Sequence, residues 1–95
     1  MTAEEIIAVS AEHFKLKPQD LVGKTRNKNV VNARQVAMVI IRQQLKLSYP
    51  KIGLLFWRDH SSVIDVMRKH EGRPLNDFDA VKAKLLSPVL DEIIL

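Results

Sequence analysis

The chain has 95 residues, a formal net charge of +4 and no cysteine, which excludes a disulfide scaffold, a thiolate metal site and a cysteine nucleophile. Hydrophobic residues make up 46% and charged residues 27% of the chain, so we expect one globular domain over residues 1–95. The chain has no apolar run near the roughly 20 residues of a membrane span, and its acidic start is unlike a signal peptide, so we expect a cytoplasmic protein.

Positive charge is concentrated in the middle of the chain. Residues 15–42 hold seven basic residues and one acid, whereas residues 1–14 and 74–95 are net acidic. This distribution is typical of a protein with one positive face for a polyanion. A lysine-rich solvated surface explains the same composition about equally well.

Capping residues, apolar spacing and proline or glycine punctuation predict a chain of helices. The first begins with a capping-box pattern at Thr2, and no segment shows sustained period-two alternation. The fold class is therefore predicted to be all-α. The expected helices cover about residues 3–14, 17–23, 30–47, 50–56, 60–71, 76–86 and 88–94.

The helix at about 30–47 is expected to be the central one, because it is the longest and contains neither glycine nor proline. Asn29 is its expected cap. Its polar face is expected to present Arg34, Gln35 and Arg42. Residues 24–29 before it contain no apolar side chain and are expected to form an exposed loop.

No catalytic or metal-binding constellation can be assembled from the sequence. The three histidines are scattered, and Ser61 and Ser62 directly follow His60 on one helical turn. Adjacent helical side chains diverge, so a serine–histidine relay is geometrically poor there. We therefore expect no enzyme activity, metal, cofactor or small-molecule substrate.

The strongest feature is the pair of short helices at about 50–56 and 60–71. Two helices joined by a short turn are typical of a helix-turn-helix, whose second helix enters the major groove of DNA. The residues at its head, from Asp59 to Ser62, can either read bases or simply cap the helix, and the residues themselves leave these readings about even. The basic loop with Arg26 and Lys28 favours DNA, because such loops contact phosphates or enter a minor groove.

Three sequence blocks then identify a family. They are KTRNKNV at 24–30, ARQVAM at 33–38, and SYPKIG at 48–53 followed by RDHSSV at 58–63. Over about residues 7–71 the chain resembles the carboxy-terminal DNA-binding domain of the bacterial replication initiator DnaA. The resemblance implies a Trp-repressor-like helical fold built around a helix-turn-helix. It also implies sequence-specific binding of double-stranded DNA in replication initiation or its regulation.

The resemblance further implies roles for single residues. Arg26 matches the family's minor-groove arginine, the Arg34–Gln35 pair matches its backbone contacts, and the triplet Asp59–Ser61 matches its major-groove reader. Arg42 and Ser62 fall on further contact positions. The complete predicted DNA-binding set is Arg26, Lys28, Arg34, Gln35, Arg42, Arg58, Asp59, His60, Ser61 and Ser62.

The chain also departs from the family pattern. Trp57 stands alone between Phe56 and Arg58, where the family usually has two glycines. We expect Trp57 to fill the core, with an exposed partner contact as the alternative. The ATPase module of the initiator has no counterpart in these residues, and the sequence is compatible with a complete small protein and with a fragment of a larger initiator.

A second class of function stays open. The same fold could be a protein-interaction module, with the initiator or other replication proteins as partners, that regulates replication without reading DNA. The apolar and acidic segment 91–95 (Asp91, Glu92, Ile93, Ile94 and Leu95) is the candidate surface. Docking of that segment on the core is the favoured alternative for it.

Overall fold

The computed structural model of the protein describes residues 1–86, and all regular secondary structure in that range is helical, which confirms the predicted all-α class. No helix within this range is long and apolar enough to cross a membrane. The helix expected at about 88–94 and the segment 91–95 lie outside the described residues. The helices are α1 (Ala3–His13), α2 (Pro18–Val22), α3 (Lys28–Leu45), α4 (Tyr49–Leu55), α5 (His60–Gly72) and α6 (Phe78–Leu86).

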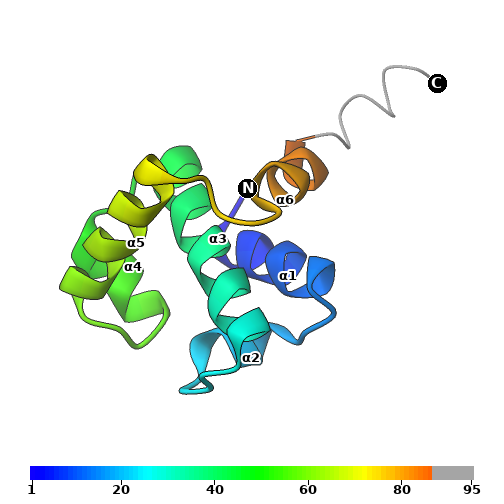
Figure 1. Cartoon of the computed structure of the whole chain (residues 1–95), viewed down its shortest axis with the longest axis horizontal. Coiled ribbons are helices and arrows are strands. Elements are labelled where there is room, and N and C mark those ends of the chain that lie inside the picture. The colour runs from blue at the N-terminus through cyan, green and yellow to red at the C-terminus, as the bar shows by residue number, and fades with distance from the viewer. Residues whose placement is uncertain (87–95) are drawn as a thin grey trace.

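α3 is the central helix, as predicted. It runs through the middle of the molecule, with α1 on one side, the α4–α5 pair on the other and α2 at its lower end (Figure 1). Six consecutive residues, 36–41, are buried. An α-helix turns by about 100° per residue, so this run buries side chains in every direction around the helix axis. α3 therefore organises the packing of the other elements.

α3 begins earlier than predicted, and the expectation that Asn29 caps it is wrong. Asn27 is the N-cap, and its Oδ1 atom accepts a hydrogen bond from the Asn29 amide at 2.9 Å. The Asn29 side chain instead donates to the carbonyl oxygen of Phe14 at 3.0 Å, at the end of α1. The sequence offers two asparagines as caps, and this tertiary contact uses the second one elsewhere.

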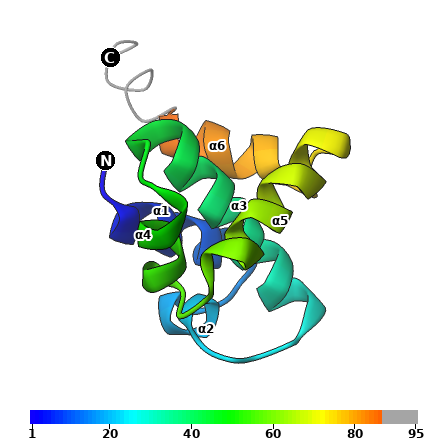
Figure 2. The same ribbon diagram turned by 90° about the vertical axis from the view of Figure 1, so that its left-hand side faces the viewer.

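α4 and α5 are held on α3 by a small apolar core. Ile52, Phe56 and Val63 are fully buried, and each such side chain contributes roughly 1.5–3 kcal/mol relative to exposure. The start of the loop between α2 and α3 lies beside the turn between α4 and α5 (Figure 2). The fold therefore brings two of the sequence-predicted regions together.

Candidate nucleic-acid interface

α4 and α5 form the predicted helix-turn-helix, and Gly53 sets their closest approach. The Gly53 carbonyl oxygen accepts hydrogen bonds from the amides of Phe56 at 3.1 Å and Arg58 at 2.8 Å. A Cβ atom at position 53 would lie 2.5 Å from the carbonyl oxygen of Arg58. Only glycine allows the backbone of α4 to come this close to the turn.

Trp57 closes the turn, and the prediction that it fills the core is wrong. Its φ is +56°, in the left-handed region, and its side chain is 78% exposed. The amide hydrogen bond from Trp57 to Leu54 (3.4 Å) and that from Arg58 to Gly53 (2.8 Å) fix this reversal. With one residue instead of two glycines, the turn places the indole on the outside of the protein.

The head of α5 is exposed and internally ordered by Asp59. This residue is the N-cap of α5, and one of its carboxylate oxygens accepts the His60 amide at 2.9 Å and lies 3.1 Å from Nδ1 of the His60 ring. The other accepts the Ser61 hydroxyl at 2.9 Å. The pKa of the Asp59 carboxyl lies below its usual value, first because of the Ser61 hydrogen bond and then because of the His60 amide. The cap is therefore observed, and base reading stays a prediction.

Arg34 does not lie on an exposed face, so the prediction that α3 presents it to solvent is wrong. The residue is only 5% exposed. Its Nε donates to the carbonyl oxygen of Leu21 at 2.7 Å, and its Nη2 donates to those of Gly23 and Thr25 at 3.2 Å each. Burial lowers the pKa of Arg34, and the like charge of Arg58 lowers it further. Arg34 thus fixes the path of the loop that carries Arg26.

Arg58 connects the helix-turn-helix to the same loop. Its Nη2 donates to the carbonyl oxygen of Gly23 at 3.1 Å, across 35 residues of sequence. Its side chain is only partly exposed. The loop and the turn before α5 are therefore joined through one backbone group.

A groove of about 280 Å³ lies between α3 and α5 and collects several predicted residues. Four of them, Arg34, Gln35, Arg58 and Ser62, line it, together with Lys69. The Lys69 ammonium donates to Oε1 of Gln35 at 3.2 Å. Asp65 is the acid among the lining residues, against three basic ones, and the remaining lining is apolar or neutral.

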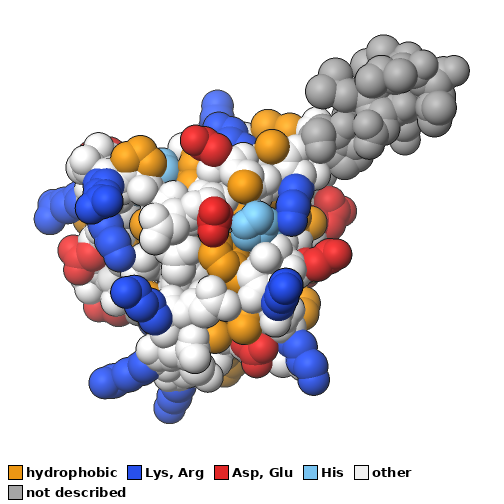
Figure 3. All heavy atoms as spheres, turned by 45° about the vertical axis from the view of Figure 1, so that its right-hand side comes forward, with side chains coloured by type: hydrophobic (Ala, Val, Ile, Leu, Met, Phe, Trp, Pro, Cys, Tyr) orange, Lys and Arg blue, Asp and Glu red, His pale blue; other side chains and the backbone are white. Residues whose placement is uncertain are grey.

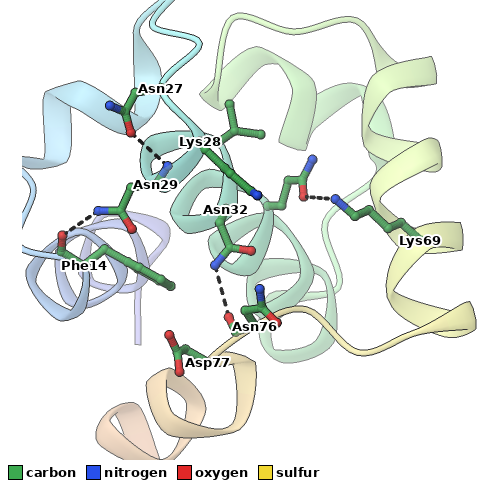
Figure 4. A pocket seen from close by; sticks show the side chains of 10 residues that line it. Phe14, Asn27, Lys28, Asn29, Asn32, Lys69, Asn76 and Asp77 are labelled. Atoms are coloured by element: carbon green, nitrogen blue, oxygen red, sulfur yellow. Dashed lines mark hydrogen bonds between the residues drawn. The ribbon is translucent and has the colours of Figure 1, made fainter.

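A second hollow, of about 550 Å³, continues past the first turn of α3 and shares Gln35 and Lys69 with the groove. It includes Lys28 and is edged by asparagine side chains, of which Asn32 donates to the carbonyl oxygen of Asn76 at 3.2 Å (Figure 4). Basic side chains also project from the lower end of the molecule, where the loop after α2 lies (Figure 3). The two hollows thus adjoin one another, and their lining holds four basic residues (Lys28, Arg34, Arg58 and Lys69) and two acids (Asp65 and Asp77).

Arg42 packs against the start of α4, whereas Arg26 is exposed in the loop before α3. Arg42 donates to the carbonyl oxygen of Leu47 at 2.7 Å, and its guanidinium lies 4.5 Å from the centre of the Tyr49 ring. It therefore supports the connection from α3 to α4, and it does not line either hollow. Arg26 is exposed in the loop, as predicted.

Lys69 is the residue that the predicted site lacks. Its position follows from helical spacing, because Ser62, Asp65 and Lys69 are three and four residues apart and share one face of α5. Within residues 1–86, no group of three or more histidine, aspartate or glutamate side chains is placed to hold a metal ion. The surface that the chain presents is suited to an extended anion.

Comparison with known proteins gives a consistent match. The family model described as "Bacterial dnaA protein helix-turn-helix" matches residues 3–69. The chain is 47% identical to the chromosomal replication initiator protein DnaA of Thermus thermophilus over 66 residues, which is 68% of this chain and 15% of that protein. It is 40% identical to the DnaA of Treponema pallidum over 92 residues, or 90% of this chain and 20% of that protein. A DnaA of Chlamydia muridarum is 41% identical over 68 residues, covering 72% of this chain and 15% of its own length. The chain therefore spans a fifth or less of the length of these relatives.

Proposed function

The chain belongs to the bacterial DnaA helix-turn-helix family, and on that premise we propose that it binds double-stranded DNA in replication initiation or its regulation. The binding is sequence-specific and takes place in the cytoplasm, on the nucleoid. The recognition helix α5 enters the major groove with its exposed head, and the loop around Arg26 enters the adjacent minor groove. Lys28, Gln35 and Lys69 contact the phosphates that lie between these two grooves.

One observation carries this proposal. Arg34 from α3 and Arg58 from the turn both bind the carbonyl oxygen of Gly23, so the loop and the head of α5 are held at one spacing. A protein that contacts a major groove and the adjacent minor groove at once needs such a fixed spacing between its two contacting parts. The buried Arg34 acts here as a positioning residue for Arg26 rather than as a backbone contact.

At the head of α5, His60 and Ser61 are the side chains placed to read base edges. Both are exposed. Asp59 orients them, because one of its carboxylate oxygens lies 3.1 Å from Nδ1 of the His60 ring and the other accepts the Ser61 hydroxyl. The Ser61 hydroxyl donates its proton to Asp59 and keeps its oxygen as an acceptor for a base, and the imidazole ring offers its second nitrogen to the groove.

Fluorescence anisotropy of labelled duplexes tests the proposal. A duplex with the binding box of the initiator family should bind more than about 100-fold more tightly than a scrambled duplex at near-physiological salt. The double variant Arg26→Ala/His60→Ala should lose this preference while circular dichroism shows unchanged helicity. Lys84→Ala, which removes an exposed positive charge from α6, is the matched control and should bind as the wild type does. Equal binding of the double variant and the wild type would refute the mechanism.

A further inference from the structure

Trp57 and Leu54 form an exposed apolar pair beside the head of the recognition helix. Each is 78% exposed. They line a shallow, largely apolar hollow of about 450 Å³ together with Gly53 and Arg58. Three residues further along the chain stands His60, one of the residues that we propose to read DNA.

The conformation of Trp57 is unfavourable in two respects. A bulky residue in the left-handed region is strained, since its Cβ atom crowds the following carbonyl group. A large indole in water also loses the free energy that burial would provide. Trp57 is not part of the described hydrophobic core. Packing in that core therefore compensates neither for the strained backbone nor for the exposed indole. Strain of this kind concentrates at functional sites.

The surroundings of the pair indicate what it contacts. Lys51 is exposed one helical turn before Leu54, and Arg58 is one of the residues that line the hollow. An apolar surface with basic residues beside it matches a DNA strand, in which apolar sugar faces and thymine methyl groups lie close to phosphates. The apolar surface of Trp57 and Leu54 also adjoins the exposed residues at the head of α5.

From this we infer that Trp57, supported by Leu54, packs against the sugar and thymine-methyl surface of the DNA strand that borders the recognition helix. The inference rests on the proposed function. It makes Trp57 an additional determinant of affinity and of thymine preference at the edge of the site. The turn shortened to one residue is then what brings an aromatic group to the DNA.

Two independent measurements test the inference. Trp57 is the only tryptophan of the chain, so selectively excited tryptophan fluorescence reports on it alone, while anisotropy of a labelled duplex reports binding. At saturating DNA, acrylamide should quench Trp57 much less than in the free protein. Trp57→Gly should bind the duplex about 10-fold more weakly, yet melt at a higher temperature, because glycine adopts the left-handed conformation without strain. Trp57→Phe keeps an apolar ring and should lie close to the wild type in affinity.

The outcomes separate this inference from the function on which it rests. If the wild type binds DNA while Trp57 stays fully open to acrylamide and Trp57→Gly binds equally well, the inference is overturned and the proposed function stands. Protection of Trp57 by protein concentration alone would also overturn it, in favour of contact between two copies of the chain. Absence of binding to any duplex would overturn both.

Discussion

Arg34 and Arg58 donate to the same acceptor, the carbonyl oxygen of Gly23, at 3.2 and 3.1 Å. Two like charges therefore converge on one backbone atom, and the charge of Arg58 contributes to the lowered pKa of Arg34. One arginine comes from the central helix and the other from the helix-turn-helix. The loop that follows Gly23 is consequently positioned by both.

Replacing Arg34 should lower the stability of the protein rather than remove a direct contact with DNA. Arg34→Ala removes the guanidinium donor from the carbonyl groups of Leu21 and Thr25 and leaves that of Gly23 with Arg58 alone, and we expect the free energy of unfolding to fall by about 2–3 kcal/mol. Arg34→Lys keeps the charge but lacks the planar fork that reaches several carbonyls, so it should recover only a small part of the loss. Urea unfolding followed by circular dichroism measures both variants. A lysine variant as stable as the wild type would show that charge alone matters.

The glycines offer a matched pair of opposite effects. Gly53→Ala places a Cβ atom 2.5 Å from the Arg58 carbonyl oxygen, so α4 must move away from the turn, at a cost of roughly 1–3 kcal/mol. Gly72 lies at the end of α5, where an added Cβ atom would meet nothing within 4 Å. Gly72→Ala should therefore stabilise the protein by up to about 1 kcal/mol through reduced freedom of the unfolded chain. Thermal melting of the two variants against the wild type checks both signs.

Asp59 should make stability depend on pH in the acid range. Its pKa is lowered in the folded protein, so its stabilising effect is complete above the pKa of the unfolded chain, about 4. That effect is lost as the pH falls through the lowered value of the folded state. Asp59→Asn retains an acceptor for the cap but does not titrate. The melting temperatures of the wild type and this variant should converge as the pH falls from 6 to about 2; parallel curves would contradict the assignment.

The salt dependence of DNA binding should count the phosphate contacts. Each cation that neutralises a phosphate contributes about one unit to the slope of log affinity against log salt. Lys69→Ala and Lys28→Ala should each reduce the slope by about one, and Lys84→Ala should leave it unchanged. Anisotropy titrations at four or five salt concentrations give the slopes. A slope that does not change in any of the three variants would place the DNA on another face.

The sequence predicts the helices well because their signals are local. The cap at Asp59, the proline at position 50 and the long apolar pattern of α3 depend on neighbouring residues only, and the structure has these helices. The head of α5 and the loop with Arg26 are likewise exposed as predicted. Whether they contact DNA is decided by experiment.

The misplaced residues depend on tertiary contacts. Arg34 lies three residues before Ala37 and four after Val30, both buried, so its spacing already places it on the apolar stripe of α3. Its charge nevertheless indicates an exposed position. The carbonyl groups that accept its hydrogen bonds belong to residues 21–25, and the local sequence of α3 does not reveal them. Trp57 is different: its exposure follows from a left-handed turn, and composition gives no sign of that conformation.

The shared carbonyl of Gly23 has a consequence for duplex geometry. Because the loop and the head of α5 are both tied to this one atom, neither can move without the other. The protein therefore fits a single combination of major-groove and minor-groove widths. A-form helices have a deep, narrow major groove and a shallow minor groove. The protein should therefore discriminate against RNA duplexes by shape, before any base is read.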